Sequence, residues 1–495
     1  MKAYYRIIHF TGLLALIATV AQSCSRRVEE FHSAEADSDT VTIHISRPVA
    51  PVSDLFWGTN FLYWVEDDLA LSDGLIENAL KELPCTVLRF PGGTVADNYH
   101  WKTNLLHNSN MFPYEEGESQ SDFDEFMGFC QRINAEPLLV VNTQSWALQG
   151  DIEGGAKEAA EWVQYCKDKG YKVKYWEIGN ETYWHPVMTA KEYGELVNVY
   201  AKAMKAVDPD IILSANGGWE IKMTGNKERT DPALWEEFRQ GYLNASSVAE
   251  YKKIKEKADS AAVKPWTKGE DKWWYDLITT CGDNIDMISV HWYFFDNNVK
   301  NIDKKIAELK SYLKELKPHK DYPICLSEYN CNTPEPHLRI TGLAESLGRF
   351  LNSGIDISCF WPLRIGGRKT LQNDRGMLAL EDKDRQYPWK IYHLFHENIK
   401  GSMIECEHPE DLFTFASFDG RQLTVVLSGR NLEAERNVVI KLPKKFRRWK
   451  MEAKTFEVPE GKMILECNDA HLTTQDKDVS IPVRSSSFTI ITFKR

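Results

Sequence analysis

The hydrophobic pattern of the chain changes its period repeatedly between residues 56 and 361. Short apolar runs, typical of buried strands, alternate with longer stretches in which apolar residues recur every three to four positions, as in amphipathic helices. Strands are predicted at 56–61, 86–90, 137–141, 174–178, 211–215, 287–292, 324–327 and 358–361. Helices are predicted at 122–133, 155–169, 191–207, 303–316 and 342–352. This alternation predicts an α/β fold, the (β/α)8 TIM barrel. A doubly wound sheet is the alternative, but it has no evident use for so many consecutive units.

A different pattern flanks this repeat. Val41, Ile43 and Ile45 alternate with polar residues, which predicts a half-buried strand. After residue 396, short alternating strands and a tight Asp419-Gly420 turn predict an antiparallel β-sandwich. We therefore expect a barrel over 51–395 and a C-terminal sandwich over 396–495, which the strand at 40–50 joins. Within this sandwich, Cys406 and Cys467 are able to form a disulfide in an oxidising compartment.

The connection between the predicted strands at 211–215 and 287–292 is unusually long. It contains a predicted helix at 273–281 and a segment, 216–270, that is rich in Lys, Glu and Trp. Long insertions usually lie at the catalytic mouth, and a solvated excursion without a role is the alternative. We expect this segment to fold over the mouth of the barrel and to place Trp219 or Trp266 near the substrate.

The first residues have the pattern of an export signal. Lys2 and Arg6 precede an apolar run, 7–21, that is too short to span a bilayer. Small residues then precede Cys24, which predicts a bacterial lipoprotein signal over 1–24, an acylated Cys24 and a tether over 25–39. Ordinary cleavage after Ser23 is the alternative. The expected location is the bacterial cell envelope, periplasm or outer membrane, with membrane contact only through the lipid anchor.

Composition and charge exclude several classes of protein. Lys and Arg number 60 against 72 Asp and Glu, and no long basic run occurs, which argues against a nucleic-acid partner. The chain contains no C-x-x-C motif or His/Cys cluster, so we expect no metal site and no cofactor. The 16 Trp and 20 Tyr provide flat apolar surfaces that suit sugars as well as cores.

Two glutamates stand at the ends of predicted strands. Glu181 follows the fourth strand and Glu328 follows the seventh, each near an asparagine, Asn180 or Asn330. The C-terminal ends of barrel strands carry the active site, so both carboxylates are expected in one mouth. Cleavage of a glycosidic bond needs such a pair: one acid protonates the leaving oxygen, while the other carboxylate attacks the anomeric carbon or activates water.

At these residues the chain resembles the clan A retaining glycoside hydrolases, in which Asn-Glu ends strand four and the nucleophilic Glu ends strand seven. Further segments narrow the resemblance to glycoside hydrolase family 51, the α-L-arabinofuranosidase family: LRFPGG at 88–93, VNT at 141–143, EAAEWVQYC at 158–166 and YWEIGNE at 175–181. The resemblance runs from about residue 41 to the C-terminus, without 216–270. It implies a barrel paired with a β-sandwich.

The resemblance also implies roles for the two glutamates. Glu181 matches the acid/base and Glu328 the nucleophile, with carboxyl oxygens about 5–5.5 Å apart in a retaining enzyme. Glu181 is then expected to hold a proton at working pH, while Glu328 stays ionised. The substrate-binding residues expected around this pair are Asn180, Arg89, His291, Tyr293, Trp361 and Asn60.

Several of these residues carry a specific expectation. Asn180 matches the residue that binds the sugar 2-hydroxyl, and Arg89 matches the arginine that positions the nucleophile. His291 and Tyr293 end the sixth strand, where the clan has a residue hydrogen-bonded to the nucleophile. Trp361 is expected to lie under the sugar. For His291 and Trp361, packing in the barrel core is the alternative reading.

The chain also departs from the family pattern. The family's first strand usually brings a Glu toward the sugar, and residues 57–62 contain none. Thr94 follows Pro91-Gly92-Gly93 where the family often has Asn or Cys, and Ser327 stands before Glu328 where it tends to Asp. The leading hypothesis is an exported, retaining exo-glycosidase similar to family 51 that acts on plant-type polysaccharides. The alternatives are another clan A specificity (a β-glycosidase, uronidase or endo-glucanase) and a non-catalytic surface glycan-binding lipoprotein.

Overall fold

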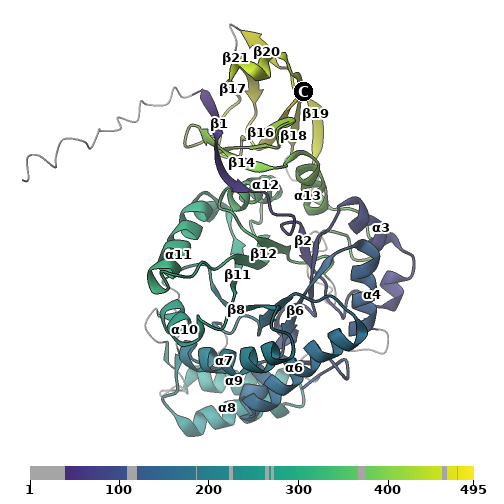
Figure 1. The fold of residues 1–495 in the computed structure, drawn as a ribbon, viewed down its shortest axis with the longest axis vertical. Helices are drawn as coiled ribbons and strands as arrows, with labels where there is room; N and C mark the ends of the chain where they lie inside the picture. Colours follow the sequence, from purple (N-terminus) through teal and green to yellow (C-terminus); the bar gives the residue numbers. More distant parts are fainter. Residues whose placement is uncertain are drawn as a thin grey trace, which may run out of the picture.

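The structure is a computed structural model that describes residues 39–108, 120–184, 187–221, 227–261, 267–268, 272–365, 375–459, 465–475 and 478–495. A ring of strands surrounded by helices forms the larger part, and a smaller β-domain packs at one end of it (Figure 1). The signal at 1–24, Cys24, the tether up to residue 38 and Trp266 lie outside the described residues. In the described part of the chain, no helix has both the length and the apolar character needed to cross a membrane.

The barrel predicted from the sequence is confirmed. Its parallel strands close in the order β11-β12-β13-β2-β3-β6-β7-β8. They are β2 (Gly58–Asn60), β3 (Val87–Phe90), β6 (Glu136–Val141), β7 (Tyr175–Ile178), β8 (Ile212–Gly218), β11 (Met287–Phe294), β12 (Ile324–Cys331) and β13 (Ile357–Phe360). Helices cover the outer face, so strand residues are buried on both sides and read as continuous apolar runs.

The interior of the barrel differs between its two ends. Near the N-terminal ends of the strands, apolar side chains form a small separate cluster: Val87, Leu138, Met287, Cys325, Ile357 and Cys359. Polar side chains replace them further along, among them Arg89, Glu177 and Glu328, which are all buried. The C-terminal end is therefore the one equipped for chemistry.

The helices around the barrel have local signals for their ends. They include α3 (Leu75–Glu82), α4 (Phe123–Ile133), α6 (Ile152–Lys169), α7 (Ala190–Val207), α10 (Trp273–Cys281), α11 (Ile302–Leu316), α12 (Pro336–Asn352) and α13 (Tyr387–Asn398). Asp122 with Glu125 and Thr189 with Glu192 form capping boxes at the starts of α4 and α7. Each such box satisfies N–H groups that the first helical turn leaves unpaired.

The C-terminal domain is one continuous hydrogen-bonded sheet around its own apolar core. The N-terminal strand β1 (Thr40–Pro51) pairs antiparallel with β14 (Ser402–Glu407) and parallel with β17 (Arg436–Lys441), which confirms that it joins this domain. The other strands are β15 (Thr414–Phe418), β16 (Gln422–Ser428), β18 (Lys450–Glu457), β19 (Glu466–Asp469), β20 (Thr473–Gln475), β21 (Asp478–Val483) and β22 (Ser487–Lys494).

The prediction of a disulfide between Cys406 and Cys467 is wrong. Both are free cysteines, and Cys406 lies in β14 while Cys467 lies in β19. Four strands, β18, β22, β16 and β15, stand between these two in the sheet. The sequence suggested the pair because these are the only two cysteines in residues 396–495, and their positions in the chain do not show how far apart their strands lie in the sheet.

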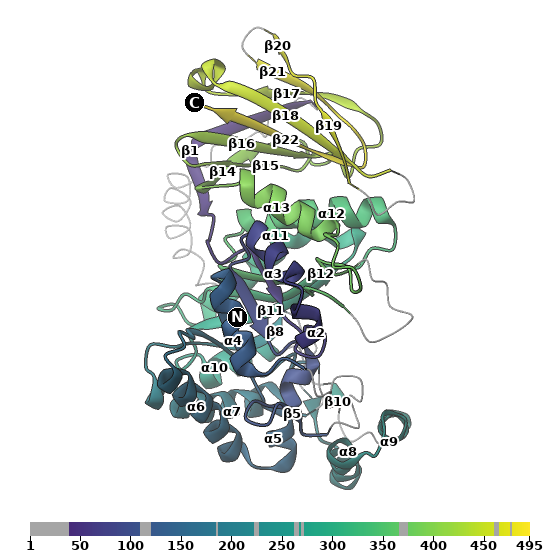
Figure 2. The same ribbon diagram turned by 90° about the vertical axis from the view of Figure 1, so that its right-hand side faces the viewer.

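The long insertion packs on the C-terminal face of the barrel, as expected. It contains α8 (Pro232–Asn244) and α9 (Val248–Ser260), which lie at the end of the molecule opposite the β-domain (Figure 2). Asn98 donates to the Tyr242 hydroxyl at 3.0 Å, and Asn108 donates to the Tyr242 carbonyl at 3.1 Å. Arg229 donates to the carbonyl of Val187 at 2.9 Å. These partners belong to the loops that leave β3 and β7, so the insertion borders the mouth.

Candidate active site

Arg89 in β3 is the centre of the polar network inside the barrel. Its side chain is fully buried and donates to Glu177 at 2.7 Å, Glu328 at 2.7 Å, Asn60 at 2.9 Å and Asn180 at 2.7 Å. Burial by itself lowers the pKa of a guanidinium, but the adjacent carboxylates of Glu177 and Glu328 raise the pKa of Arg89. The charge is therefore retained, and four strands are fixed relative to one another through a single side chain.

Glu328 lies in β12 at an irregularity of the strand. Val290 pairs with Leu326 but the next residue, His291, pairs with Glu328, so Ser327 is an extra residue in the ladder. A β-bulge allows two consecutive side chains to face the same side. Accordingly, Ser327 donates to Glu177 at 3.1 Å while Glu328 accepts from Arg89, both inside the barrel.

Glu181 lies just beyond β7 in a left-handed backbone conformation. Its φ is +45°, and Gly179 two residues earlier has a φ of +74°. This turn carries the Glu181 carboxylate to 2.9 Å from Nδ1 of His291, which lies 3.5 Å from Glu328. One oxygen of each glutamate and Nδ1 of His291 all lie within 4.8 Å of one another. The structure thus brings together the two carboxylates that the sequence singled out.

Two further side chains of β11 hold the carboxylates. Tyr293 donates its hydroxyl to Glu328 at 2.6 Å, and Arg89 occupies the other Glu328 oxygen. His291 is almost fully buried and lies between the two glutamates. Its Nε2 is buried and has no hydrogen-bond partner among the described residues. Both β11 residues therefore stand where the sequence expected contacts with Glu328.

Burial and charge act against each other on these groups. Burial raises the pKa of Glu328, and the charges of His291 and Arg89 oppose that effect without reversing it. Arg89 alone would lower the pKa of Glu328, but the carboxylate is almost fully buried and burial has the larger effect. Burial by itself lowers the pKa of His291, but the carboxylates of Glu328 and Glu181 raise it. The positive form of His291 is thereby favoured when both carboxylates are ionised.

Asn180 presents a free donor to the site. Its side-chain oxygen accepts from Arg89 at 2.7 Å, whereas its Nδ2 is buried and has no partner among the described residues. A buried donor without a partner costs free energy, which a ligand acceptor would recover. The expected contact of Asn180 with a sugar hydroxyl is consistent with this geometry.

Asp97 is a buried carboxylate that the sequence analysis did not single out. It accepts from the backbone N–H of Asn180 at 3.1 Å and from the Thr143 hydroxyl at 2.9 Å. Burial raises the pKa of Asp97 to about 7. Glu177 was also missed, although a charged residue inside an otherwise apolar strand was a usable signal. For Asp97 no comparable signal exists, because it lies in a short 3-10 helix, Thr94–Asn98.

Asn60 belongs to the buried polar network around Arg89, whereas Trp361 packs on a glycine. Asn60 is fully buried, accepts from Arg89 and donates to main-chain carbonyls, among them that of Ser327 at 3.0 Å. It therefore holds Arg89 and the bulge in place. Trp361 is half-buried, and its indole packs on Gly93, where an added Cβ would lie 2.7 Å from the ring. Gly93 is thus needed for the position of Trp361.

Trp219 leaves β8 at the mouth but has one face occupied. Its ring stacks on that of Trp292 with centroids 4.3 Å apart and planes 5° from parallel. Trp292 is buried on the outer side of β11. The contact places Trp219 against the barrel wall rather than free over the two glutamates.

The cluster of Glu181, His291 and Glu328 has donor atoms close enough for a metal ion. Arg89 donates to Glu328, however, and its positive charge disfavours a cation at that oxygen. A second cluster of His44, Glu405 and Glu407 lies on the surface of the β-domain. There, Glu405 already accepts from Arg47 at 3.1 Å. Neither arrangement leads us to assign a metal.

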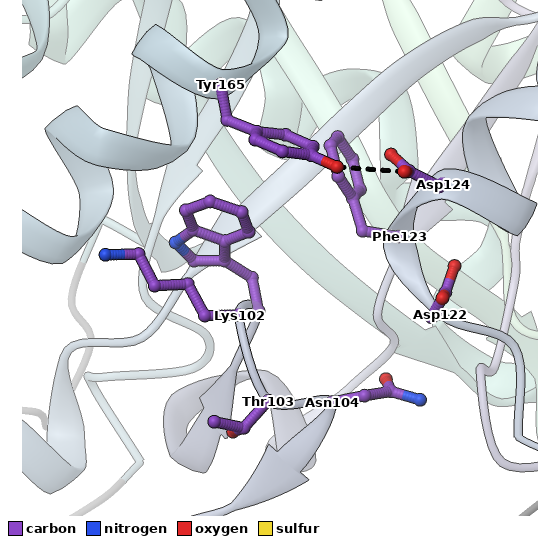
Figure 3. Close-up of a pocket in the computed structure, with 8 residues that line it drawn as sticks. Lys102, Thr103, Asn104, Asp122, Phe123, Asp124 and Tyr165 are labelled. Atoms are coloured by element: carbon purple, nitrogen blue, oxygen red, sulfur yellow. Dashed lines mark hydrogen bonds between the residues drawn. The ribbon is translucent and has the colours of Figure 1, made fainter. Parts of the chain in front are cut away.

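A separate cavity of about 390 Å³ opens on the flank of the barrel (Figure 3). Asp124 at its rim accepts from Tyr165 and Lys169, both at 2.8 Å, and Asp122 caps α4. Its acidic groups are thus already bonded within the protein, and we assign no ligand to it. The residues that line it are Trp101, Lys102, Thr103, Asn104, Asp122, Phe123, Asp124 and Tyr165.

Sequence comparisons confirm the resemblance to arabinofuranosidases. A profile described as "Alpha-L-arabinofuranosidase 1 domain" matches residues 79–258. The chain is 32% identical over 161 residues to the probable alpha-L-arabinofuranosidase C of Aspergillus niger, a match that covers 27% of this chain and 30% of that protein. The chain thus spans less than a third of the length of this curated relative.

Solved structures confirm the fold. A family 51 alpha-L-arabinofuranosidase from Bifidobacterium longum has a TM-score of 0.64 at 15% identity and covers 92% of this chain and 99% of its own. CelM2, a bifunctional glucanase-xylanase protein from a metagenome library, has a TM-score of 0.62 at 15% identity with the same coverages. The barrel with a C-terminal β-domain is therefore shared by proteins of different named activities.

Proposed function

We propose that this protein is a retaining glycoside hydrolase that removes α-L-arabinofuranosyl groups from plant-type polysaccharides or oligosaccharides. The observation that carries the proposal is the pair of carboxylates, Glu181 and Glu328, with oxygens within 4.8 Å around His291. Retaining enzymes keep their carboxyl groups about 5–5.5 Å apart, whereas inverting enzymes need about 6.5–9.5 Å to admit a water molecule. The match to the arabinofuranosidase profile supports the sugar.

Glu328 is proposed as the nucleophile. Arg89 and Tyr293 each donate to one of its oxygens, which fixes the carboxylate and favours its ionised form. Attack on the anomeric carbon gives a covalent glycosyl-enzyme, and the bond to the leaving oxygen breaks. Asn180 then offers its unpaired Nδ2 to the sugar as positive charge develops in the oxocarbenium-like state.

Glu181 is proposed as the acid/base. Its side chain is more exposed than that of Glu328, at 20% against 5%, so that leaving groups and water have access to it. It protonates the leaving oxygen in the first step and takes a proton from water in the second. His291 hydrogen-bonds to Glu181 and also contacts Glu328. It therefore holds the two carboxylates in position relative to each other while Glu181 gives up and regains its proton.

A panel of chromogenic glycosides with NMR of the first-formed sugar tests this proposal. We expect turnover of an α-L-arabinofuranoside and release of the sugar with its anomeric configuration unchanged. Initial release of the opposite anomer would exclude retention. Turnover of another glycoside alone would exclude the arabinofuranosidase activity while leaving the carboxylate pair intact.

Another clan A specificity is the second candidate. The TM-score to a bifunctional glucanase-xylanase protein, 0.62, is close to the 0.64 found for a family 51 arabinofuranosidase. The chain also lacks a Glu over 57–62 and has Thr94 after Gly93. The same panel, with β-xylosides, β-glucosides and glucuronides included, separates this candidate from the first.

We also propose export to the cell envelope as a lipoprotein. The support is the apolar run at 7–21 followed by Cys24. Expression of the full chain in a Gram-negative host, followed by membrane fractionation and mass spectrometry of the mature N-terminus, tests it. An acylated Cys24 is the expected result, and a soluble periplasmic form that begins at Cys24 without lipid would contradict acylation.

A further inference from the structure

The turn that carries Glu181 is held in a strained conformation from two sides. A residue other than glycine rarely adopts a positive φ such as the +45° of Glu181, and it keeps one only where its surroundings impose it. On one side, Asn216 in β8 donates to the carbonyl of Gly179 at 3.1 Å and accepts from the N–H of Thr182 at 2.9 Å. Asn216 is fully buried, so these bonds hold the turn against the barrel wall without competition from water.

On the other side, the turn depends on Asp97 and Thr143. One oxygen of Asp97 accepts from the N–H of Asn180 at 3.1 Å and from the Thr143 hydroxyl at 2.9 Å. All three residues are buried. Asp97 belongs to the loop that follows β3, and Thr143 belongs to the loop that follows β6. The position of Glu181, the next residue after Asn180, therefore depends on how these two loops lie relative to each other.

The long insertion ties the same two loops together through one hydroxyl group. Asn98 directly follows Asp97 in the chain. Gln144 likewise directly follows Thr143. Both side-chain amides donate to the hydroxyl oxygen of Tyr242 in α8, that of Asn98 at 3.0 Å. Asn98, Gln144 and Tyr242 are all buried, so a single hydroxyl bridges the loops inside the protein.

Other contacts fix α8 in this place. Arg239 of α8 donates to the carbonyl of Leu148 in α5 (Gln144–Gln149), the helix that begins at the loop after β6. The ring of Tyr242 packs edge-on against that of Tyr251 in α9, with centroids 5.5 Å apart. The insertion thus presents the Tyr242 hydroxyl from a packed helix and not from a free loop.

Resting on the proposed function, we propose that Tyr242 is a positioning residue for the acid/base Glu181. Its hydroxyl fixes the loops after β3 and β6, these loops hold the N–H of Asn180, and the turn of Glu181 is fixed in consequence. Tyr242 acts through Asn98 and Gln144 and takes no part in bond cleavage. The insertion is then part of the structure that catalysis needs, in contrast to a solvated excursion without a role.

Two substrates that differ only in the leaving group isolate the acid function of Glu181. The leaving oxygen of methyl α-L-arabinofuranoside must be protonated, whereas the dinitrophenyl group of dinitrophenyl α-L-arabinofuranoside leaves without a proton. The ratio of kcat/KM on the methyl glycoside to kcat/KM on the dinitrophenyl glycoside therefore reports how well the acid is placed. Within one preparation this ratio is independent of the fraction that folds.

Tyr242→Phe removes the hydroxyl and keeps the packed ring. We expect kcat/KM to fall about fivefold to twentyfold on the methyl glycoside and to stay within about twofold on the dinitrophenyl glycoside, because two buried amides lose their acceptor. Asn98→Ala should change the ratio in the same direction. Once Asn98→Ala and Gln144→Ala are combined, Tyr242→Phe should lower the ratio no further, since the hydroxyl has then already lost both donors.

Tyr322→Phe is the matched control. Tyr322 is buried and donates its hydroxyl to the carbonyl of Gly282 at 2.8 Å, just before β12 and thus at the end of the barrel away from the mouth. Its ratio should not change. An unchanged ratio in both Tyr242→Phe and Asn98→Ala, or an equal loss on both glycosides, would overturn this inference. Failure of the unmodified protein to cleave either glycoside would instead overturn the proposed function.

Discussion

Asp97 holds part of the site in place and also makes the stability of the protein depend on pH. It holds the backbone N–H of Asn180, next to Glu181, and burial raises its pKa to about 7. In the unfolded chain an aspartate titrates near 3.9. Between these values the folded protein binds more protons than the unfolded one, so the contribution of Asp97 to stability falls as pH rises from about 4 to about 7.

Asp97→Asn removes this dependence while keeping an oxygen for Asn180. We expect the variant to gain stability relative to the unmodified protein as pH rises from 4 to 8, by up to about 4 kcal/mol, and the difference to stay constant above pH 8. Thermal unfolding followed at several pH values measures it. Tm curves that run parallel across this range would show that Asp97 does not titrate there.

Tyr293 offers a second test at the residue scale. Its hydroxyl donates to Glu328 and favours the ionised carboxylate, so Tyr293→Phe should raise the pKa of Glu328 further. The acidic limb of the pH profile of kcat/KM should move to higher pH, and kcat/KM at its optimum should fall about 10- to 100-fold. Tyr312→Phe on α11 is the control, since it leaves the site untouched. An unshifted acidic limb would contradict the assigned role.

At the scale of elements, the close packing of α12 on the β-domain can be tested by substituting one glycine. Gly348 in α12 leaves no room for a side chain, because an added Cβ would lie 2.3 Å from the Phe415 ring in β15. Gly128 in α4 is a matched helical glycine whose added Cβ would meet nothing closer than 3.5 Å, at Arg132. The two positions therefore separate overpacking from helix propensity.

Gly348→Ala should lower the free energy of unfolding by about 1–3 kcal/mol, because overpacking outweighs the helical preference for alanine. Gly128→Ala should raise it by about 0.5–1 kcal/mol. Urea denaturation of both variants measures the difference. Equal stabilities would mean that the α12 interface can relax without cost.

The elements also show where the hydrophobic pattern is informative and where it fails. The strands and the helices α4, α6 and α7 have ordinary apolar periods, and their predicted bounds lie close to the observed ones. The start of α12 was predicted at residue 342 but lies at Pro336. Charged Arg339 and Glu345 are buried there, so no polar face marks the helix. Strands β11 and β12 also run past their predicted ends, because their last residues carry the site.

At the scale of the whole molecule, the order of the strands in the barrel determines which residues meet in the candidate site. The closed parallel barrel brings the C-terminal ends of β7, β11 and β12 together, which explains why residues far apart in sequence could be grouped in advance. The hydrogen bonds from Arg89 to Glu177 and from Asn180 to Asp97 were missed because they depend on side-chain directions inside the barrel, although the charge of Glu177 within an apolar strand was a usable signal. The predicted β-domain disulfide is wrong because the apolar pattern of antiparallel strands does not reveal their order in the sheet, where four strands separate Cys406 from Cys467.

Chemical rescue with azide tests the central assignment of Glu328 and Glu181 most directly. With a glycosyl fluoride, Glu328→Ala should be inactive until azide is added and should then form a glycosyl azide of inverted configuration. Glu181→Ala should still be glycosylated by the fluoride, and azide should release a product of retained configuration. NMR of the two azides gives the result. Retained azide from Glu328→Ala and inverted azide from Glu181→Ala would reverse the two roles, and no rescue of either variant would contradict the two-carboxylate account.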